Sequence, residues 1–166
     1  MRPTDRAWRL SAAALLLAAT AFPASAADKP CTEADKAFDG VTSWGALQKA
    51  VADYGQCDKG KTADVVTDAL LRVVISGWPR VADAGPILDG DAAFKSWLNR
   101  RLSNPDMAAE DSREIRDLAK GSCPKGQDKV CSQILSAVEM GRMLSAPDLQ
   151  LAPAPAAAPA APAKKP

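Results

Sequence analysis

The sequence predicts an all-α fold, a single small bundle of five or six short helices stapled by two disulfides. Apolar residues recur at spacings of three and four along most of the chain, which is the period of a helix with one buried face. Almost no stretch alternates apolar and polar residues at period two, as a half-buried strand would. The chain has four cysteines, and an even count in a small exported domain is typical of disulfide bonding.

Residues 1–26 have the pattern of a bacterial secretory signal peptide. Three arginines precede an apolar run rich in Ala and Leu, and small residues at 24–26 form a cleavage site. A membrane anchor is the alternative, but the apolar run is short for a bilayer and the cleavage site follows it directly. We expect cleavage after Ala26 and a periplasmic or secreted product.

The remaining chain divides into a disulfide-bonded helical domain over 27–149 and a disordered tail over 150–166. The tail is almost entirely Ala and Pro, and proline both fixes φ and removes a hydrogen-bond donor. It ends in Lys164-Lys165-Pro166. A loose contact with the cell wall and a tolerated compositional run are both compatible with this ending.

In the first half of the domain, one or two helical turns are expected at 32–38 and two long helices after them. Thr42 or Ser43 caps the first long helix, and Gly55 ends it in a left-handed conformation. Its buried face holds apolar residues at helical spacing, namely Trp44, Leu47, Val51 and Tyr54. Thr62 caps the second helix, which runs to the Trp78-Pro79 pair.

In the second half, Gly85-Pro86 is expected to break the segment 80–89 into a short helix and a loop. Asp89 or Asp91 caps a helix whose inward residues are Phe94, Trp97, Leu98 and Leu102. Asn104-Pro105 fits a new helix start, and Asp111 with Glu114 fits a variant capping box for a helix that ends at Gly121. A last helix starts near Gln127, and its apolar residues are Val130, Ile134, Leu135, Val138, Met143 and Leu144.

The cysteines are expected to pair as Cys31–Cys57 and Cys123–Cys131, because each pair flanks a predicted turn or helix. Four cysteines allow three pairings, and the sequence alone leaves the other two open. A structural zinc site would need clustered ligands, whereas this chain has no CxxC motif and no histidine. We expect no cofactor and no metal.

Composition narrows the possible chemistry. Without histidine, Ser-His-Asp and Cys-His catalysis are excluded, and oxidised cysteines supply no thiol nucleophile. Cleavage at 26 removes three arginines and one aspartate from 21 basic and 20 acidic residues, which leaves 18 against 19. A net charge of −1 gives no general attraction to nucleic acid or anionic lipid.

Carboxylates remain the only candidates for acid–base chemistry. Asp64 and Asp68 lie one helical turn apart, with Asp58 before them, and Arg72 one turn further has the spacing of a surface ion pair. A solvated helix face, a partner-binding surface and an acid–base pair are all compatible with this pattern. Asp89-Gly90-Asp91 lacks the later glutamate of a calcium loop, so a capping turn explains it better.

The domain contains three tryptophans, each a candidate either for the core or for a binding surface. Trp44 and Trp97 lie on apolar stripes, so both are expected in the core. Trp78 lies between Gly77 and Pro79 at a helix end, so of the three it is the best candidate for partial exposure and contact with a partner. Core or edge packing is the favoured interpretation even for Trp78, because large apolar side chains are seldom left exposed.

The pattern Trp44-x-x-Leu47, Tyr54-Gly55-Gln56-Cys57-Asp58-x-Gly60 and Trp78 resembles small exported bacterial helical proteins that are uncharacterised. The resemblance covers about half of the domain and implies no activity. Such proteins carry an acidic residue soon after the Gly60 position, where this chain has Lys61-Thr62-Ala63 before Asp64. In size, compartment and disulfide usage the chain is also similar to periplasmic immunity proteins.

We therefore expect an exported, non-enzymatic protein-binding module of the bacterial envelope with an unknown protein partner. An immunity or inhibitor protein is the closest alternative. A small carboxylate-based hydrolase and a carrier of apolar ligands are the others. An exposed apolar or charged concave patch would favour binding, two facing carboxyl groups in a cleft would favour the hydrolase, and a closed apolar pocket would favour the carrier.

Overall fold

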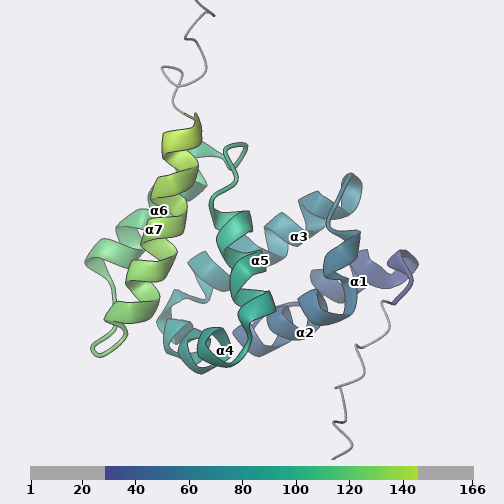
Figure 1. The fold of residues 1–166 in the computed structure, drawn as a ribbon, viewed down its shortest axis with the longest axis horizontal. Coiled ribbons are helices and arrows are strands. Elements are labelled where there is room, and N and C mark those ends of the chain that lie inside the picture. The colour runs from purple at the N-terminus through teal and green to yellow at the C-terminus, as the bar shows by residue number, and fades with distance from the viewer. Residues whose placement is uncertain (1–28, 146–166) are drawn as a thin grey trace, which may run out of the picture.

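The computed structural model describes residues 29–145, and within this range the chain is all-α, as predicted (Figure 1). It forms seven α-helices, one or two more than expected, because two short segments also close helical turns. The signal peptide predicted for 1–26 and the tail predicted for 150–166 lie outside the described residues. In chain order the helices are α1 (Ala34–Asp39), α2 (Trp44–Tyr54), α3 (Lys61–Leu71), α4 (Ala84–Gly90), α5 (Ala92–Leu102), α6 (Ala109–Gly121) and α7 (Asp128–Ser145).

The first three helices form one half of the bundle, where α1 packs against both α2 and α3. The Ser43 hydroxyl accepts a hydrogen bond from the Ala46 N–H and caps α2, as predicted. The prediction for Gly55 is wrong, because this residue keeps right-handed helical angles and continues the chain into the 3-10 turn η2 (Gly55–Cys57). Gly60, with φ of 57°, takes the N-cap position of α3 in place of Thr62.

The chain between α3 and α5 forms three further helical segments, which are interrupted at Gly77 and Asp91. A π-helical segment, η3 (Arg72–Ser76), follows α3 and ends at Gly77, where a Cβ atom would lie 2.4 Å from the Val73 carbonyl oxygen. The 3-10 segment η4 (Trp78–Asp83) then leads into α4. The predicted break at Gly85-Pro86 is absent, since the proline falls in the first turn of α4, where no N–H is needed.

In the second half, α6 and α7 lie side by side and α5 packs against α7 (Figure 1). Asp91 caps α5 by accepting a hydrogen bond from the Phe94 N–H at 2.9 Å, as predicted. The helix start predicted at Asn104-Pro105 is wrong. These residues lie in a loop, residues 103–108, in which the Asn104 side chain accepts from the Asp106 N–H, and α6 begins only at Ala109.

One continuous apolar core joins the two halves. Trp44 and Trp97 are 1% and 4% exposed, which confirms their predicted place in it. The four inward residues predicted for α5 are all buried as well. Met143 and Leu144 were predicted among the apolar residues of the last helix, but they lie on the exposed side of the last turns of α7.

Both predicted disulfides are confirmed. Cys31 and Cys57 are bonded with their Cα atoms 5.5 Å apart, and Cys123 and Cys131 are bonded at 6.0 Å. The first bridge joins the turn before α1 to η2, and the second joins the loop after α6 to α7. Each bridge therefore joins two elements at a turn or loop next to a helix.

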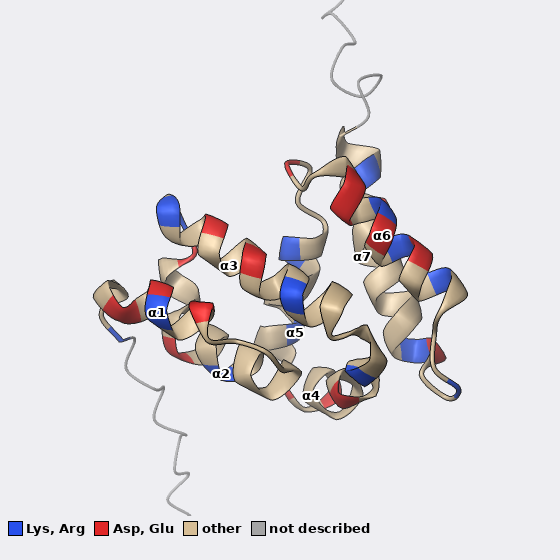
Figure 2. Ribbon diagram, turned by 180° about the vertical axis from the view of Figure 1, so that it is seen from behind, with Lys and Arg blue, Asp and Glu red and all other residues tan. Residues whose placement is uncertain are grey.

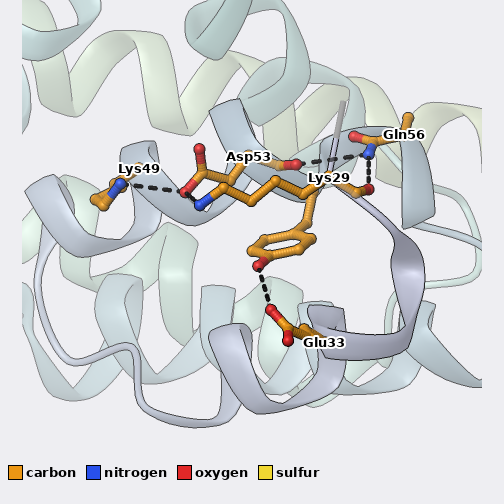
Figure 3. Close-up of polar contacts among 6 residues, drawn as sticks. Lys29, Glu33, Lys49, Asp53 and Gln56 are labelled. Carbon is orange, nitrogen blue, oxygen red and sulfur yellow. Dashed lines mark hydrogen bonds and ion pairs between the residues drawn. The ribbon is translucent and has the colours of Figure 1, made fainter. Parts of the chain in front are cut away.

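A polar cluster holds the start of the described chain beside the first disulfide (Figure 3). The Lys29 ammonium lies 2.8 Å from the Asp53 carboxylate, which also receives Lys49 at 3.1 Å. The Gln56 side chain donates to the Lys29 carbonyl at 2.9 Å, and the Tyr54 hydroxyl donates to Glu33 at 3.4 Å. The Lys29 hydrogen bond lowers the pKa of the Asp53 carboxyl, and Asp53 in turn raises the pKa of Lys29. These contacts connect this segment to α2 and η2, and all of them are structural in kind.

Candidate functional site

Asp58 is a structural residue and not the surface contact that the sequence suggested. Its side chain is only 9% exposed, and one oxygen accepts a hydrogen bond from the Trp97 indole N–H at 3.1 Å. The other oxygen lies 3.3 Å from an Arg101 nitrogen, an ion pair without the geometry of a hydrogen bond. Arg101 also donates to the Ala63 carbonyl and the Thr67 hydroxyl. The network joins α5 to the start of α3, so Asp58 is not available to a partner.

Trp78 is also buried, at 3% exposure, which confirms the favoured core packing and not the alternative of partial exposure. The indole N–H donates to the Ser122 carbonyl at 2.9 Å, where α6 ends. The Ser122 carbonyl is 44 residues away in the sequence. It accepts from the indole N–H, the one polar group of the side chain, which would otherwise be buried without a hydrogen bond. Trp78 therefore connects η4 to α6 and has no surface for a partner.

Asp64 and Asp68 do remain at the surface, where Figure 2 shows acidic residues along α3. They line an open hollow of about 330 Å³ between α3 and the loop before α6. The loop and α6 contribute two further carboxylates, Asp106 and Asp111. We call this feature, with its four aspartates, the acidic hollow.

The four carboxylates of the acidic hollow are not neutralised by neighbours. None of them forms an ion pair with another residue in the range 29–145. Arg101 lines the hollow, but its guanidinium is engaged by Asp58, Ala63 and Thr67. The predicted Asp68–Arg72 pair is absent, because Arg72 donates to two backbone carbonyls of the α1–α2 connection. Like charges one turn apart on α3 therefore repel each other without compensation.

A second hollow of opposite charge lies on the other side of the same loop. It measures about 510 Å³ and is lined by Arg113 and Arg116 of α6 and Arg142 of α7. The two hollows share Asn104 and Met107 of the loop. We call the second one the basic hollow.

An exposed apolar group completes the surface features of this end of the molecule. Met140, Met143 and Leu144 on α7 are 52%, 60% and 49% exposed. Side chains of this size are normally buried in a small domain, and together they form an apolar edge on the last turns of the helix.

Four carboxyl groups in the range 29–145 have a lowered pKa. Hydrogen bonds from neighbouring side chains lower the pKa of Asp53, Asp89, Asp91 and Glu139. A general acid would need a shift in the opposite direction. Within residues 29–145 no group of three or more acidic or cysteine side chains is arranged to hold a metal ion.

Sequence reasoning found two residues of the acidic hollow and none of the basic one. Asp111 is predicted only as part of a capping box, and Asp106 carries no sequence prediction. The arginines of α6 have an ordinary surface pattern in the sequence. Only the fold of the loop 103–108 brings α3, α6 and the end of α7 to its two sides, and the sequence carries no local signal for that.

No helix within residues 29–145 is both long and apolar enough to span a membrane. Comparison of the chain with protein-family models, curated proteins and solved structures finds no match. The resemblance to small exported helical proteins therefore stays a prediction, and the function has to be argued from the site itself.

Proposed function

We propose that the chain is an exported, non-enzymatic binding module of the bacterial envelope, and that its acidic hollow binds a basic segment of a protein partner. The observation that carries the proposal is the uncompensated charge of the hollow. Four aspartates line it, while Arg101, the cation that also lines it, is already engaged.

The arrangement is unfavourable for the isolated domain. Asp64 and Asp68 repel each other across one turn of α3, which destabilises a helix by about 0.2–0.5 kcal/mol. Lysine or arginine side chains of a partner would convert this repulsion into attraction, and complementary charge raises both association rate and specificity. An open hollow lined by charged groups suits such a contact better than it suits an apolar ligand.

Export to the periplasm rests on the leader pattern of residues 1–26 and on the two disulfides, which form and persist in oxidising compartments. An immunity or inhibitor role is the form of this function in which the partner is a toxin or enzyme of the envelope. The charge of the hollow supports binding of a basic protein segment, and it is equally compatible with a toxin and with an enzyme as the partner.

The test is affinity capture from an envelope extract with the exported full-length protein and two double variants. Asp64→Asn with Asp68→Asn removes two charges from the acidic hollow. Glu110→Gln with Glu114→Gln is the matched control, because these residues also lie one turn apart and exposed, on α6. We expect a basic partner that the first variant loses and the control retains, with binding that weakens as salt rises. Equal capture by all three proteins would contradict the proposal.

A further inference from the structure

The basic hollow has the dimensions and the lining of a small-molecule site. Its volume of about 510 Å³ falls within the range of ligand pockets in proteins. It lies between the start of α6 and the end of α7, two helices that pack closely along their length. Its walls are therefore regular helix on both sides and not mobile loop alone.

Three guanidinium groups reach this hollow from two helices. Arg113 forms no ion pair with any residue that the structure describes. Arg116 pairs with Asp117 at 3.1 Å and Arg142 with Glu139 at 2.7 Å, and both partners are on the same helix as their arginine. Exposed pairs of this kind contribute little, and a guanidinium with five N–H donors keeps several of them free for a ligand.

The lining also contains a hydroxyl without a protein partner. Ser112 lines the hollow, and its side chain makes no hydrogen bond to another residue within 29–145, although the side chains of Thr67, Ser103 and Ser145 all do. The residue is 8% exposed, yet its oxygen is not among the fully buried side-chain atoms that lack a partner in this range, which are Trp44 Nε1 and Asp58 Oδ1. The hydroxyl is therefore accessible and can donate to an atom that enters the hollow.

The start of α6 contributes backbone to the lining and no net positive charge. The residue before it, Ala108, offers no side chain to cap the helix, and Ala109 lies in the lining of the hollow. The first turn also carries Glu110 and Asp111, whose negative charges offset the positive end of the helix dipole. The arginines and the Ser112 hydroxyl are therefore the donors that suit a ligand in this hollow.

We propose that the basic hollow binds a small anionic molecule whose recognised groups are carboxylates or phosphates. Guanidinium forks match the oxygens of both groups, with two parallel N–H bonds to each. The Ser112 hydroxyl donates to a further oxygen of the same molecule. This site is separate from the acidic hollow and would function whether or not that hollow binds a protein.

Titration with two probes tests the proposal. Inorganic phosphate and the tricarboxylate tricarballylate are added separately to the full-length protein at constant ionic strength, and arginine side-chain and backbone NMR signals are followed. We expect saturable shifts at Arg113 and at the start of α6, with a Kd of the order of 1 mM or tighter for at least one probe. The stronger probe identifies the preferred anion class.

Three variants show whether the binding is specific. Arg113→Gln is expected to weaken binding about tenfold, as loss of one charge-assisted contact would. Arg100→Gln, an exposed arginine of α5 outside the hollow, should leave the affinity unchanged. Ser112→Ala should also weaken binding, yet leave the melting temperature of the ligand-free protein unchanged, because the hydroxyl makes no hydrogen bond to another described residue. A purely structural serine would give a lower melting temperature and unchanged affinity.

Two results would overturn the proposal. One is the absence of saturable shifts with either probe. The other is saturation that Arg113→Gln and Arg100→Gln weaken equally, since that is the behaviour of a general counterion effect and not of a site.

Discussion

Replacing Asp58 with alanine should destabilise the domain far more than any other loss of a single aspartate. The change removes the acceptor of the Trp97 indole N–H and the counter-charge of Arg101. Loss of one partner from a buried ion pair destabilises by about 3–5 kcal/mol. Arg101 is 16% exposed and keeps the Ala63 and Thr67 oxygens, so we reduce the expectation to about 2–4 kcal/mol.

Urea unfolding followed by tryptophan fluorescence measures this directly. The expected loss is a large share of the ~5–15 kcal/mol that stabilises a typical domain. Asp58→Asn keeps an oxygen for Trp97 and loses only the charge, so it should lie between wild type and Asp58→Ala. The control is Asp64→Ala, an exposed change expected to stay within about 0.5 kcal/mol. If Asp58→Ala and Asp64→Ala unfold at the same urea concentration, Asp58 does not hold α5 to α3.

Three further changes test the remaining structure. Replacing Cys31 and Cys57 together by serine opens a loop with a sequence separation of 26; we expect a loss of about 3.5 kcal/mol in urea unfolding, and a loss under 1 kcal/mol would contradict the chain-entropy reasoning. Gly77→Ala places a Cβ atom 2.4 Å from the Val73 carbonyl oxygen, so we expect the free energy of unfolding to fall by about 1–3 kcal/mol. A melting temperature equal to that of wild type would show that the π-helical turn relaxes freely. Hydrogen bonds from Gln48 and from the Phe94 N–H lower the pKa of Asp91. The ionised carboxylate therefore stabilises the fold above the ordinary aspartate pKa of about 3.9, and this stability is lost as pH falls through the lowered pKa. Between about pH 5 and pH 2 the melting temperature of Asp91→Asn should fall less steeply than that of wild type, and parallel curves for the two proteins would refute this.

The fold was predictable where local chemistry decides it. Helical spacing, the capping residues Ser43 and Asp91, and the two disulfides were all predicted correctly. Each depends on residues close in the sequence or on a short list of possible pairings. The wrong predictions concern residues whose local sequence is compatible with two backbone conformations. Gly55 was expected to adopt a left-handed conformation but keeps right-handed helical angles, and Asn104 forms a turn and not a helix cap.

The candidate site was predictable only in part, because it depends on contacts between distant segments. Trp78 was the best candidate for partial exposure from its place at a helix end, but Ser122, 44 residues away, receives its N–H in the core. In the sequence Asp58 does not differ from its exposed neighbours, but in the structure it is buried beside Trp97 and Arg101. The charge of the hollows likewise arises from three helices and one loop that the sequence does not bring together.

The most direct test of the proposed function is site-specific photo-crosslinking in intact cells. A photoreactive residue at Ala108, which is exposed and lines the acidic hollow, is compared with one at Ser132, exposed on α7 outside it. We predict one protein adduct at position 108, absent at 132, that disappears when Asp64 and Asp68 are both changed to asparagine. No adduct at 108, or an adduct that persists without the two carboxylates, would contradict binding at the acidic hollow.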